Sequence, residues 1–503
     1  MNVDLLLTLP VLIPLTASAL CVAAWGAMRL QVAITVISSA ALLVVSLILL
    51  MAVAHGAVLV TRFGDWAAPF AIAFAADRLA GAMVAVTGVL GLAVAIYAMA
   101  DVRRIAAISG FYPLYNGLLS GVTGAFLTAD LFNLYVWFEV MLIASFGLLV
   151  LNKTRDQLDA GMKYLALNIL GTLLFLAGIA LAYNAAGTLN LADLAVTLQS
   201  GEQGAVGDIA AWLLLLAFLM KAGAFPLFAW LPASYHTGSI AVTAIFAGLL
   251  TKVGVYAIIR IYTLVVPLEG TLLQPILLVV AGLTMVTGVF GAAVQWDVRR
   301  ILSFHIISQI GYMLLGLALY TPYAIAAAVF YVVHHIIVKA NLFLVAGVMA
   351  REGGSYDVRE NGGLALMTPF LAVLFLVPAL SLGGIPPLSG FWAKLMIIDA
   401  GLEVEAWILT GVALAVGLLT LFSMGKIWAY AFWRAPAGAV RRTVGWQRMV
   451  PIAGLAAVTV AIGLNAEPLV AFSLAAAEQL IEPTDYIAAL LPPEGAAVAE
   501  ADQ

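Results

Sequence analysis

The chain has 503 residues, of which 64% are hydrophobic and 10% are charged, whereas soluble domains carry about 25% charged residues. No soluble fold of this length hides so much apolar surface, so the composition predicts an all-α polytopic membrane protein. We expect the lipid bilayer to surround it and expect no nucleic acid as a partner. The one cysteine, Cys21, excludes a disulfide framework and a cysteine-based metal or iron–sulfur site. We find no motif that binds a flavin or haem and expect no cofactor.

Stretches long enough to cross a membrane follow one another along the chain. A spanning helix needs about 20 apolar residues. Residues 1–20 lack the basic start and the clear cleavage site of a signal peptide, so we predict that they begin the first span. We predict fourteen spans, at residues 4–25, 31–54, 77–99, 108–128, 131–151, 162–186, 209–230, 239–263, 271–293, 300–319, 322–350, 369–398, 404–432 and 449–473.

Two segments of this single membrane domain resemble each other in sequence, and we call this similarity the internal echo. Residues 120–131 (SGVTGAFLTADL) resemble residues 287–298 (TGVFGAAVQWDV). Five helices separate the copies, so the second crosses in the opposite sense, which indicates two inverted five-helix repeats; chance similarity among small residues is the alternative. The predicted parts are residues 1–105 (helices 1–3), 106–265 (first repeat, helices 4–8), 266–432 (second repeat, helices 9–13), 445–475 (helix 14) and an acidic extracytoplasmic tail at 476–503.

Positive residues gather on one side of this topology. With the N-terminus outside, the cytoplasmic loops hold thirteen Lys and Arg residues, and the opposite side holds Arg62, Arg78 and Arg260, two of them at helix edges. Because cytoplasmic loops carry an excess of Lys and Arg, we predict an even number of spans with both termini extracytoplasmic. The thirteen are Arg29, Arg103, Arg104, Lys153, Arg155, Arg299, Arg300, Arg351, Arg359, Arg434, Arg441, Arg442 and Arg448.

Six of the seven lysines fall inside or at the edges of predicted spans. A charge at mid-bilayer costs about 2.5–3.5 kcal/mol on insertion scales, so their repeated use indicates a chain that moves ions or protons. Lys163 and Lys426 have simpler explanations, because Asp159 lies one turn before Lys163 and Lys426 is near enough to an interface to snorkel. The six are Lys163, Lys221, Lys252, Lys339, Lys394 and Lys426.

Two predicted spans contain helix breakers beside a lysine. Lys221 is followed by Ala-Gly-Ala-Phe and then Pro226, and a Gly-Gly-Ile segment followed by Pro386 and Pro387 precedes Lys394. Proline removes a backbone donor and clashes with the preceding turn. We therefore predict that helices 7 and 12 are broken in the membrane, leaving backbone groups free for water or an ion; kinks that serve only packing are the alternative.

Buried charges in the first half suggest a pair. Glu139 and Lys221 are each the only charge near the centre of their helices, and a lysine partner favours the charged form of a buried carboxylate. We predict that Glu139 pairs with Lys221, with a structural ion pair that never titrates as the alternative. Lys252 and Lys394 suit a relay, because a buried amine gives up its proton more easily than a solvated one.

Histidines extend this pattern into the second half. His335 and Lys339 are four residues apart and share a helix face with His334 beside them, and His305 begins a further polar strip. Histidine titrates near neutrality, so we predict a proton path through these residues. A metal site and plain hydrogen bonding between helices remain as alternatives, although no carboxylate or cysteine accompanies the histidines at ligand spacing.

These motifs carry a family resemblance. Residues 218–260 (FLMKAGAFPLFAWLPASYHTGSIAVTAIFAGLLTKVGVYAIIR) and 381–398 (SLGGIPPLSGFWAKLMII) resemble the antiporter-like subunits of respiratory complex I and of Mrp-type cation/proton antiporters. The resemblance covers about residues 70–430. It implies that Glu139 pairs with Lys221, that Lys252 and the His334–Lys339 helix continue a relay, and that Lys394 ends it. Residues 299–320 (RRILSFHIISQIGYMLLGLALY) look like D subunits of the Mrp type.

The resemblance implies a function. We expect an ion-transporter subunit, not an enzyme, in the bacterial plasma membrane, which moves protons in a hetero-oligomeric sodium/proton antiporter together with other subunits. The alternative is an antiporter-like, proton-pumping subunit of a complex I or membrane-bound hydrogenase type complex. A self-sufficient transporter of an organic solute would need more hydrogen-bonding side chains at the helix breaks than we find. Sodium need not pass through this chain, because Glu139 is its only deeply placed carboxylate and hard cations prefer several oxygens.

Overall fold

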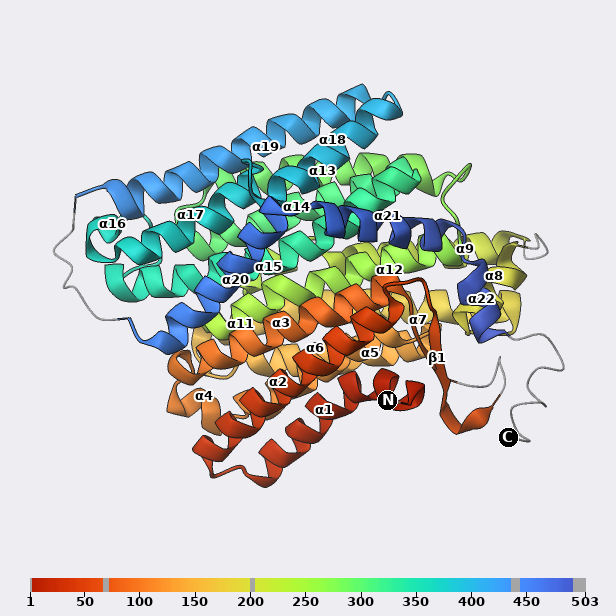
Figure 1. The fold of residues 1–503 in the computed structure, drawn as a ribbon, viewed down its shortest axis with the longest axis horizontal. Helices are drawn as coiled ribbons and strands as arrows, with labels where there is room; N and C mark the ends of the chain where they lie inside the picture. Colours follow the sequence, from red (N-terminus) through yellow and green to blue (C-terminus); the bar gives the residue numbers. More distant parts are fainter. Residues whose placement is uncertain (1, 67–71, 200–203, 436–443, 492–503) are drawn as a thin grey trace.

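The computed structural model describes residues 2–66, 72–199, 204–435 and 444–491. Most of its helices run side by side along one direction, as expected for spans that share a membrane normal (Figure 1). Within the described residues, twelve helices are long and apolar enough to cross a membrane. Strand β1 and helices α8 and α22 lie at one end of the bundle, and α4 and α16 lie at the other (Figure 1).

The N-terminal part is a helical layer with a small hairpin. The face that α2 buries is polar, with Gln31, Thr35, Ser38 and Ser46, while its exposed face is apolar, as suits a helix between protein and lipid. The four-residue strands of the hairpin were not predicted, because they are too short to show an alternating pattern. The elements are α1 (Val3–Ala23), α2 (Met28–Val53), β1 (Leu59–Arg62), the 3-10 turn η1 (Phe63–Asp65), β2 (Ala73–Ala76), α3 (Arg78–Asp101) and α4 (Arg104–Ile108).

The next elements form the first half of the predicted repeat region. Helix α7 begins earlier than expected because Thr154 caps it by accepting a hydrogen bond from the backbone of Gln157. The elements are α5 (Phe111–Leu127), α6 (Leu131–Leu149), α7 (Arg155–Ala186), α8 (Leu191–Gln199), α9 (Gly204–Ala222), α10 (Trp230–Ser234), α11 (Ile240–Ile245), the π-helical turn η2 (Phe246–Leu250) and α12 (Thr251–Leu264).

The second half surrounds the most buried helix of the molecule. The most apolar stretches of α15 and of the continuous segment Ile240–Leu264 are buried throughout, whereas most other spans expose an outer face. The elements are α13 (Leu273–Val294), α14 (Val298–Leu319), α15 (Pro322–Gly353), α16 (Leu364–Met367), α17 (Pro369–Gly383), α18 (Ser389–Glu403), α19 (Trp407–Ile427) and the π-helical turn η3 (Trp428–Trp433).

The internal echo has a structural counterpart. Asp130 caps α6 through the backbone N–H of Asn133, and Asp297 caps α14 through the backbone N–H of Arg299. Helix α15 begins and ends 167 residues after α7, the same offset that separates the two echoing segments. The repeat itself remains a prediction, which these matched elements support.

The last predicted span, 449–473, is interrupted. Helix α20 (Trp446–Leu464) ends before Asn465, and α21 (Glu467–Ile481) begins with Pro468 in its first turn, so the continuous helix that we predicted is wrong at this point. Part of the predicted acidic tail also folds, as the end of α21 and α22 (Thr484–Leu490). Residues 492–503 of that tail, and Arg441 and Arg442 of the predicted cytoplasmic loops, lie outside the described residues.

Each of the fourteen predicted stretches falls on a helix or an interrupted helix. Two of them differ from the twelve long spans: 108–128 corresponds to α5, which has 17 residues, and 369–398 corresponds to the pair α17 and α18. The all-α membrane fold is confirmed, while the count of fourteen crossings stays a prediction.

Candidate functional site

The first predicted break is present between α9 and α10. Helix α9 ends one residue after Lys221, and Gly223 takes a positive φ of 77°, which turns the chain out of the helix. The peptide bond before Pro226 is cis, and the neighbouring Phe225 donates its backbone N–H to the hydroxyl of Thr284 on α13 at 3.0 Å. The indole of Trp230 donates at 2.9 Å to the carbonyl of Met220, which also accepts the backbone N–H of Gly223, so the end of α9 is joined to α10.

Lys221 is joined to Glu139 through a hydroxyl. The buried Nζ of Lys221 donates to Thr172 Oγ1 at 2.9 Å and to the backbone carbonyl of Asn168 at 3.3 Å, and Thr172 Oγ1 donates to Glu139 Oε1 at 2.7 Å. Among the described residues, no direct ion pair joins Glu139 to Lys221. The predicted pair is therefore indirect, because the α7 side chain of Thr172 lies between the helices that carry the two charges.

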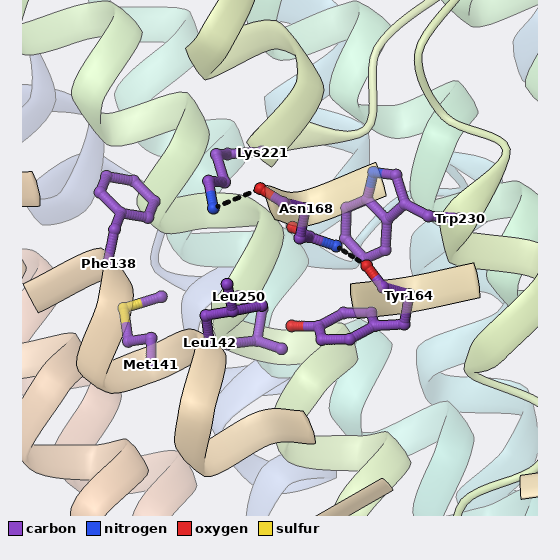
Figure 2. A pocket seen from close by; sticks show the side chains of 8 residues that line it. All are labelled: Phe138, Met141, Leu142, Tyr164, Asn168, Lys221, Trp230 and Leu250. Atoms are coloured by element: carbon purple, nitrogen blue, oxygen red, sulfur yellow. Dashed lines mark hydrogen bonds between the residues drawn. The ribbon is translucent and has the colours of Figure 1, made fainter. Parts of the chain in front are cut away.

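A small cavity lies beside Lys221. It has a volume of about 20 Å³, and its polar lining comes from Tyr164, Asn168, Lys221 and the indole of Trp230. A buried water needs roughly 10–15 Å³ and two to four polar partners, so the cavity can hold one water molecule. In Figure 2 the Lys221 amine points toward Asn168 at the edge of this cavity, and Leu250 of η2 lies below.

Lys252 lies directly after the π-helical turn η2. It is completely buried, and its Nζ donates to the carbonyl of Ala247 at 2.5 Å. π-helical turns shift the backbone ladder and are frequent at functional sites. Gly254 packs against the backbone of α9 at Lys221 and Ala222, where no larger side chain fits, so α12 brings Lys252 close to the first break.

The centre of the molecule holds polar atoms without protein partners. Within the described residues, both ring nitrogens of His305 and His335, and the Nζ of Lys339, make no hydrogen bond although they are buried. An unpaired buried polar group is costly, so these three side chains need a functional rather than a packing explanation.

A chain of hydrogen bonds continues from the centre to the second break. His334 Nδ1 and Ser389 Oγ are 2.8 Å apart, and the hydroxyls of Ser389 and Ser381 are 3.1 Å apart. Beside them, the hydroxyl of Tyr331 donates to Gln309 Oε1 at 2.5 Å. The predicted histidine helix is thus connected to the break by two serines that flank it.

The second predicted break lies between α17 and α18. Gly384 takes a positive φ of 90°, and the Pro386–Pro387 peptide bond is cis. Lys394, on the far side of the break from α17, donates its Nζ to the freed carbonyl of Gly383 at 3.2 Å and lies 5.2 Å from the ring centre of Tyr312. Both interruptions that the glycine and proline pattern predicts are present, and each has a lysine beside it.

Sequence reasoning missed three hydroxyl residues that lie beside the two breaks, namely Thr172, Ser381 and Ser389. Ser381 and Ser389 could have been found, because they flank the Gly-Gly-Ile-Pro-Pro segment at its two ends. Thr172 had no such signal, since threonine is common in membrane helices and the contact depends on how α6, α7 and α9 meet. Among the described residues, no three His, Cys, Asp or Glu side chains gather as a metal site requires.

Three other charged positions have structural partners. Arg260, which we predicted at an extracytoplasmic helix edge, is instead buried and forms two hydrogen bonds of 2.6 and 2.7 Å with Asp77, the cap of α3. Burial alone would raise the pKa of Asp77, but the charge and hydrogen bonds of Arg260 hold it below its ordinary value. Lys163 pairs with Asp159 at 2.6 Å on the surface, as its simpler explanation predicted. Lys426 is buried and donates to the carbonyls of Ala293 and Gln295 at the end of α13, and its snorkelling to an interface stays a prediction.

A larger cavity opens at the end of the bundle that we predict to be cytoplasmic. It has a volume of about 530 Å³ and lies between α7, α10 and α14, with Asp156, Asp159, His236 and Arg300 among its lining residues. His236 and Arg300 are 3.2 Å apart at their nearest nitrogens. Burial, helped by the Arg300 charge, lowers the pKa of His236. Pro232, Ala233 and His236, which also line the cavity, follow the first break in the chain.

Known proteins are similar to this chain in sequence. The family described as NADH:quinone oxidoreductase/Mrp antiporter, TM, matches residues 128–420. This range includes both breaks and the predicted site residues from Glu139 to Lys394. The chain belongs to this family. The D-type subunit of the Na(+)/H(+) antiporter of Alkalihalophilus pseudofirmus is 45% identical over 489 residues, covering 97% of this chain and 99% of that protein. The predicted family is thereby confirmed, and within it the chain is similar to D subunits.

Solved structures of the family agree. A chain in the structure of the Mrp complex from Dietzia sp. DQ12-45-1b is 34% identical, with a TM-score of 0.92, and the alignment covers 98% of this chain and 100% of that one. A chain of the membrane-bound sulfane sulfur reductase, an archaeal respiratory membrane complex, is 27% identical with a TM-score of 0.90, covering 97% and 99%. The family therefore keeps this fold in complexes of different types.

Proposed function

We propose that the chain is the proton-translocating subunit of a multisubunit sodium/proton antiporter. The observation that carries the proposal is the line of titratable side chains that crosses both halves, from the partly exposed Glu139 and the buried Lys221 through Lys252 and the histidines to Lys394. Ionisable groups inside a membrane are costly and mark ion and proton pathways. A line that alternates amines, imidazoles and hydroxyls transfers protons, whereas it offers few oxygens to a bare cation.

The roles of the individual residues follow from their surroundings. Glu139 and Lys221 form the charged end of the line, and Lys252 passes protons between the first break and the central histidines. His305, His334, His335 and Lys339 form the central part of the line. Lys394 ends the line at the second break, where the carbonyl of Gly383 holds it.

Partner subunits belong to this proposal. Glu139 is partly exposed on the surface of the chain although it lies on the spanning helix α6. A carboxylate that faces lipid is unfavourable, so we propose that another subunit of a hetero-oligomeric complex covers this face of α6. Sodium is then handled in a partner or at such an interface.

We also propose a location and an orientation. The family and the positive residues support a bacterial plasma membrane protein with both termini extracytoplasmic. In this orientation the cavity beside His236 and Arg300 opens to the cytoplasm and supplies water and protons to the first break. Asp130 lies at the opposite end of the bundle, where burial raises its pKa to about 6.

A transport assay tests the proposal. The complete set of subunits is produced in a strain lacking its own antiporters, and a pH gradient is formed across everted vesicles. Addition of sodium should collapse the gradient with the complete set and should leave it intact when this chain alone is omitted.

The same vesicles separate the antiporter from its alternative, a subunit of a redox-driven pump. A chain of the same fold in a respiratory membrane complex supports this alternative. Proton movement that needs an electron donor and acceptor, and that ignores sodium, would contradict the antiporter assignment.

A further inference from the structure

Thr172 occupies the point where three helices meet at the first break. Its hydroxyl lies on α7, accepts from Lys221 of α9 at 2.9 Å and donates to Glu139 of α6 at 2.7 Å. The side chain is buried, and both partners approach it from other helices. The hydroxyl thus has one donor and one acceptor in place, one on each side.

The hydrogen bonds of the Thr172 hydroxyl differ from those that a threonine usually makes in a helix. A helical threonine normally donates to the carbonyl four residues earlier, which competes with other partners. Thr172 instead donates its hydroxyl to Glu139, and the carbonyl four residues earlier, that of Asn168, accepts from Lys221 at 3.3 Å. The usual bond is made by Thr87, Thr123, Thr263, Thr284, Thr410, Thr420 and Thr459.

Small residues bring the helices close enough for this contact. Gly171 faces the side chain of Met220, and Gly178 faces Leu214, at distances that leave little room for even a methyl group. Glycines let α7 and α9 approach closely, as in many membrane interfaces. The neighbouring residue Thr172 is thereby held within reach of Lys221.

The small cavity offers no other path between the two charges. Within the described part of the chain, its lining includes Lys221 and Asn168 but neither Thr172 nor Glu139. The hydrogen-bonded route from Lys221 to Glu139 runs through the Thr172 hydroxyl.

We propose that Thr172 carries the proton between Lys221 and Glu139. An N–H bond of the Lys221 ammonium breaks as a new O–H bond forms at Thr172 Oγ1, and the original hydroxyl proton bonds to Glu139 Oε1. The ammonium becomes a neutral amine, the carboxylate becomes a carboxylic acid, and the hydroxyl is regenerated. Nothing is oxidised, no water is required, and the reverse step uses the same atoms.

The Asn168 carbonyl gives the hydroxyl a second acceptor. Once Lys221 is neutral, its hold on this carbonyl weakens, because a charged donor makes the stronger hydrogen bond. Thr172 then turns toward Asn168, as a helical threonine ordinarily does, and this rotation separates Glu139 from Lys221 until Lys221 is charged again. The hydroxyl therefore both transfers the proton and resets the contact.

Two substitutions separate a proton-carrying role from a packing role. Thr172→Val keeps the branched shape and removes the hydroxyl, whereas Thr172→Ser keeps the hydroxyl and removes a methyl group. If the hydroxyl carries the proton, sodium-driven proton flux of the complete complex should fall about a hundredfold in the valine variant, the scale of a lost proton-transfer group. It should stay within about twofold of the wild type in the serine variant, since one O–H replaces another.

The control is Thr87→Val on α3, which removes a buried hydroxyl that bonds only the carbonyl of Met83. Flux and membrane abundance of the complex should match the wild type in this variant. An active valine variant, or a serine variant as inactive as the valine one at normal abundance, would overturn the role of Thr172. Because the inference rests on the proposed function, a wild-type complex without any sodium-driven flux would overturn both.

Discussion

The two helix breaks hold their lysines in different surroundings. Lys221 precedes its break and meets a hydroxyl, a carbonyl and, one bond further, the carboxylate of Glu139. Lys394 follows its break and meets the carbonyl of Gly383 and the ring of Tyr312. Among the described residues, no carboxylate is in ion-pair contact with Lys394.

This difference suggests that the two breaks have different roles in proton transfer. Under the proposed function, a lysine with a carboxylate one hydroxyl away would exchange its proton locally, and the pair would stay neutral overall. A lysine without one must exchange with the histidine line or with the outside, and its charge remains uncompensated meanwhile. We expect the first break to control when a proton is loaded and the second break to control when it leaves.

The largest expected effect comes from removing the carboxylate. Glu139→Ala should abolish sodium-driven proton flux, a loss of about a hundredfold or more, because Lys221 loses its local acceptor. The complex should still assemble, since Glu139 is partly exposed and contributes little packing. Flux in everted vesicles and the abundance of the complex are measured together. Near-normal flux at every pH would show that the carboxylate is structural.

The second prediction concerns the lysines that lack a carboxylate. Lys252→Arg and Lys394→Arg keep the positive charge, but arginine is effectively always protonated. A relay needs the neutral amine, so flux should fall at least tenfold in each variant, and as far in Lys394→Arg as in Lys252→Arg. The readout is the same flux assay at matched abundance. Full activity in both variants would leave these lysines as fixed charges beside a path that runs elsewhere.

Much of this arrangement is visible in the sequence. Lysines and histidines in apolar stretches are rare enough to stand out, and Gly and Pro beside Lys221 and Lys394 predict both breaks from backbone chemistry alone. The family follows from the same residues. These features are local, so composition and spacing suffice to find them.

The rest depends on how distant segments meet. Thr172 is an ordinary helical threonine until α6 and α9 lie against α7, and the Glu139–Lys221 pair is therefore indirect in a way that spacing does not predict. The π-helical turn before Lys252 reflects a shift in backbone hydrogen bonding inside a uniformly apolar stretch. The interruption between α20 and α21 did have a signal in Asn465 and Pro468, which the apolar run around them outweighed.

The third prediction compares the breaks themselves. Pro226→Ala and Pro387→Ala restore a backbone donor and remove a ring clash, so each should allow a more continuous helix. Flux should slow by about fivefold in each, the effect of roughly 1 kcal/mol, without loss of a titrating group. The pH dependence of the remaining flux should keep its shape. Unchanged rates in both variants would show that the breaks serve packing alone.

The two breaks also differ in what supports them from outside. Gly463, at the end of α20, packs so closely on the backbone of Pro387 and Leu388 that no side chain fits there. Its carbonyl accepts the indole N–H of Trp392 at 2.9 Å, and Trp392 lies two residues before Lys394. The interrupted last span therefore holds the second break in place, whereas the first break is supported by Thr284 of α13.

The smallest expected effect tests this support. Trp392→Phe keeps the ring and removes one hydrogen bond, worth about 1 kcal/mol, so flux should fall by fivefold at most. Trp407→Phe, at an exposed position on α19, is the matched control and should change nothing. The informative measurement is a pair of double-mutant cycles on the logarithm of the flux. Residues that share one structural element couple, and distant ones add. Trp392→Phe should couple with Pro387→Ala, because both loosen the same break, and should add independently to Pro226→Ala. Equal additivity with both prolines would mean that the last span does not hold the second break, and that the two breaks differ only in the groups around their lysines.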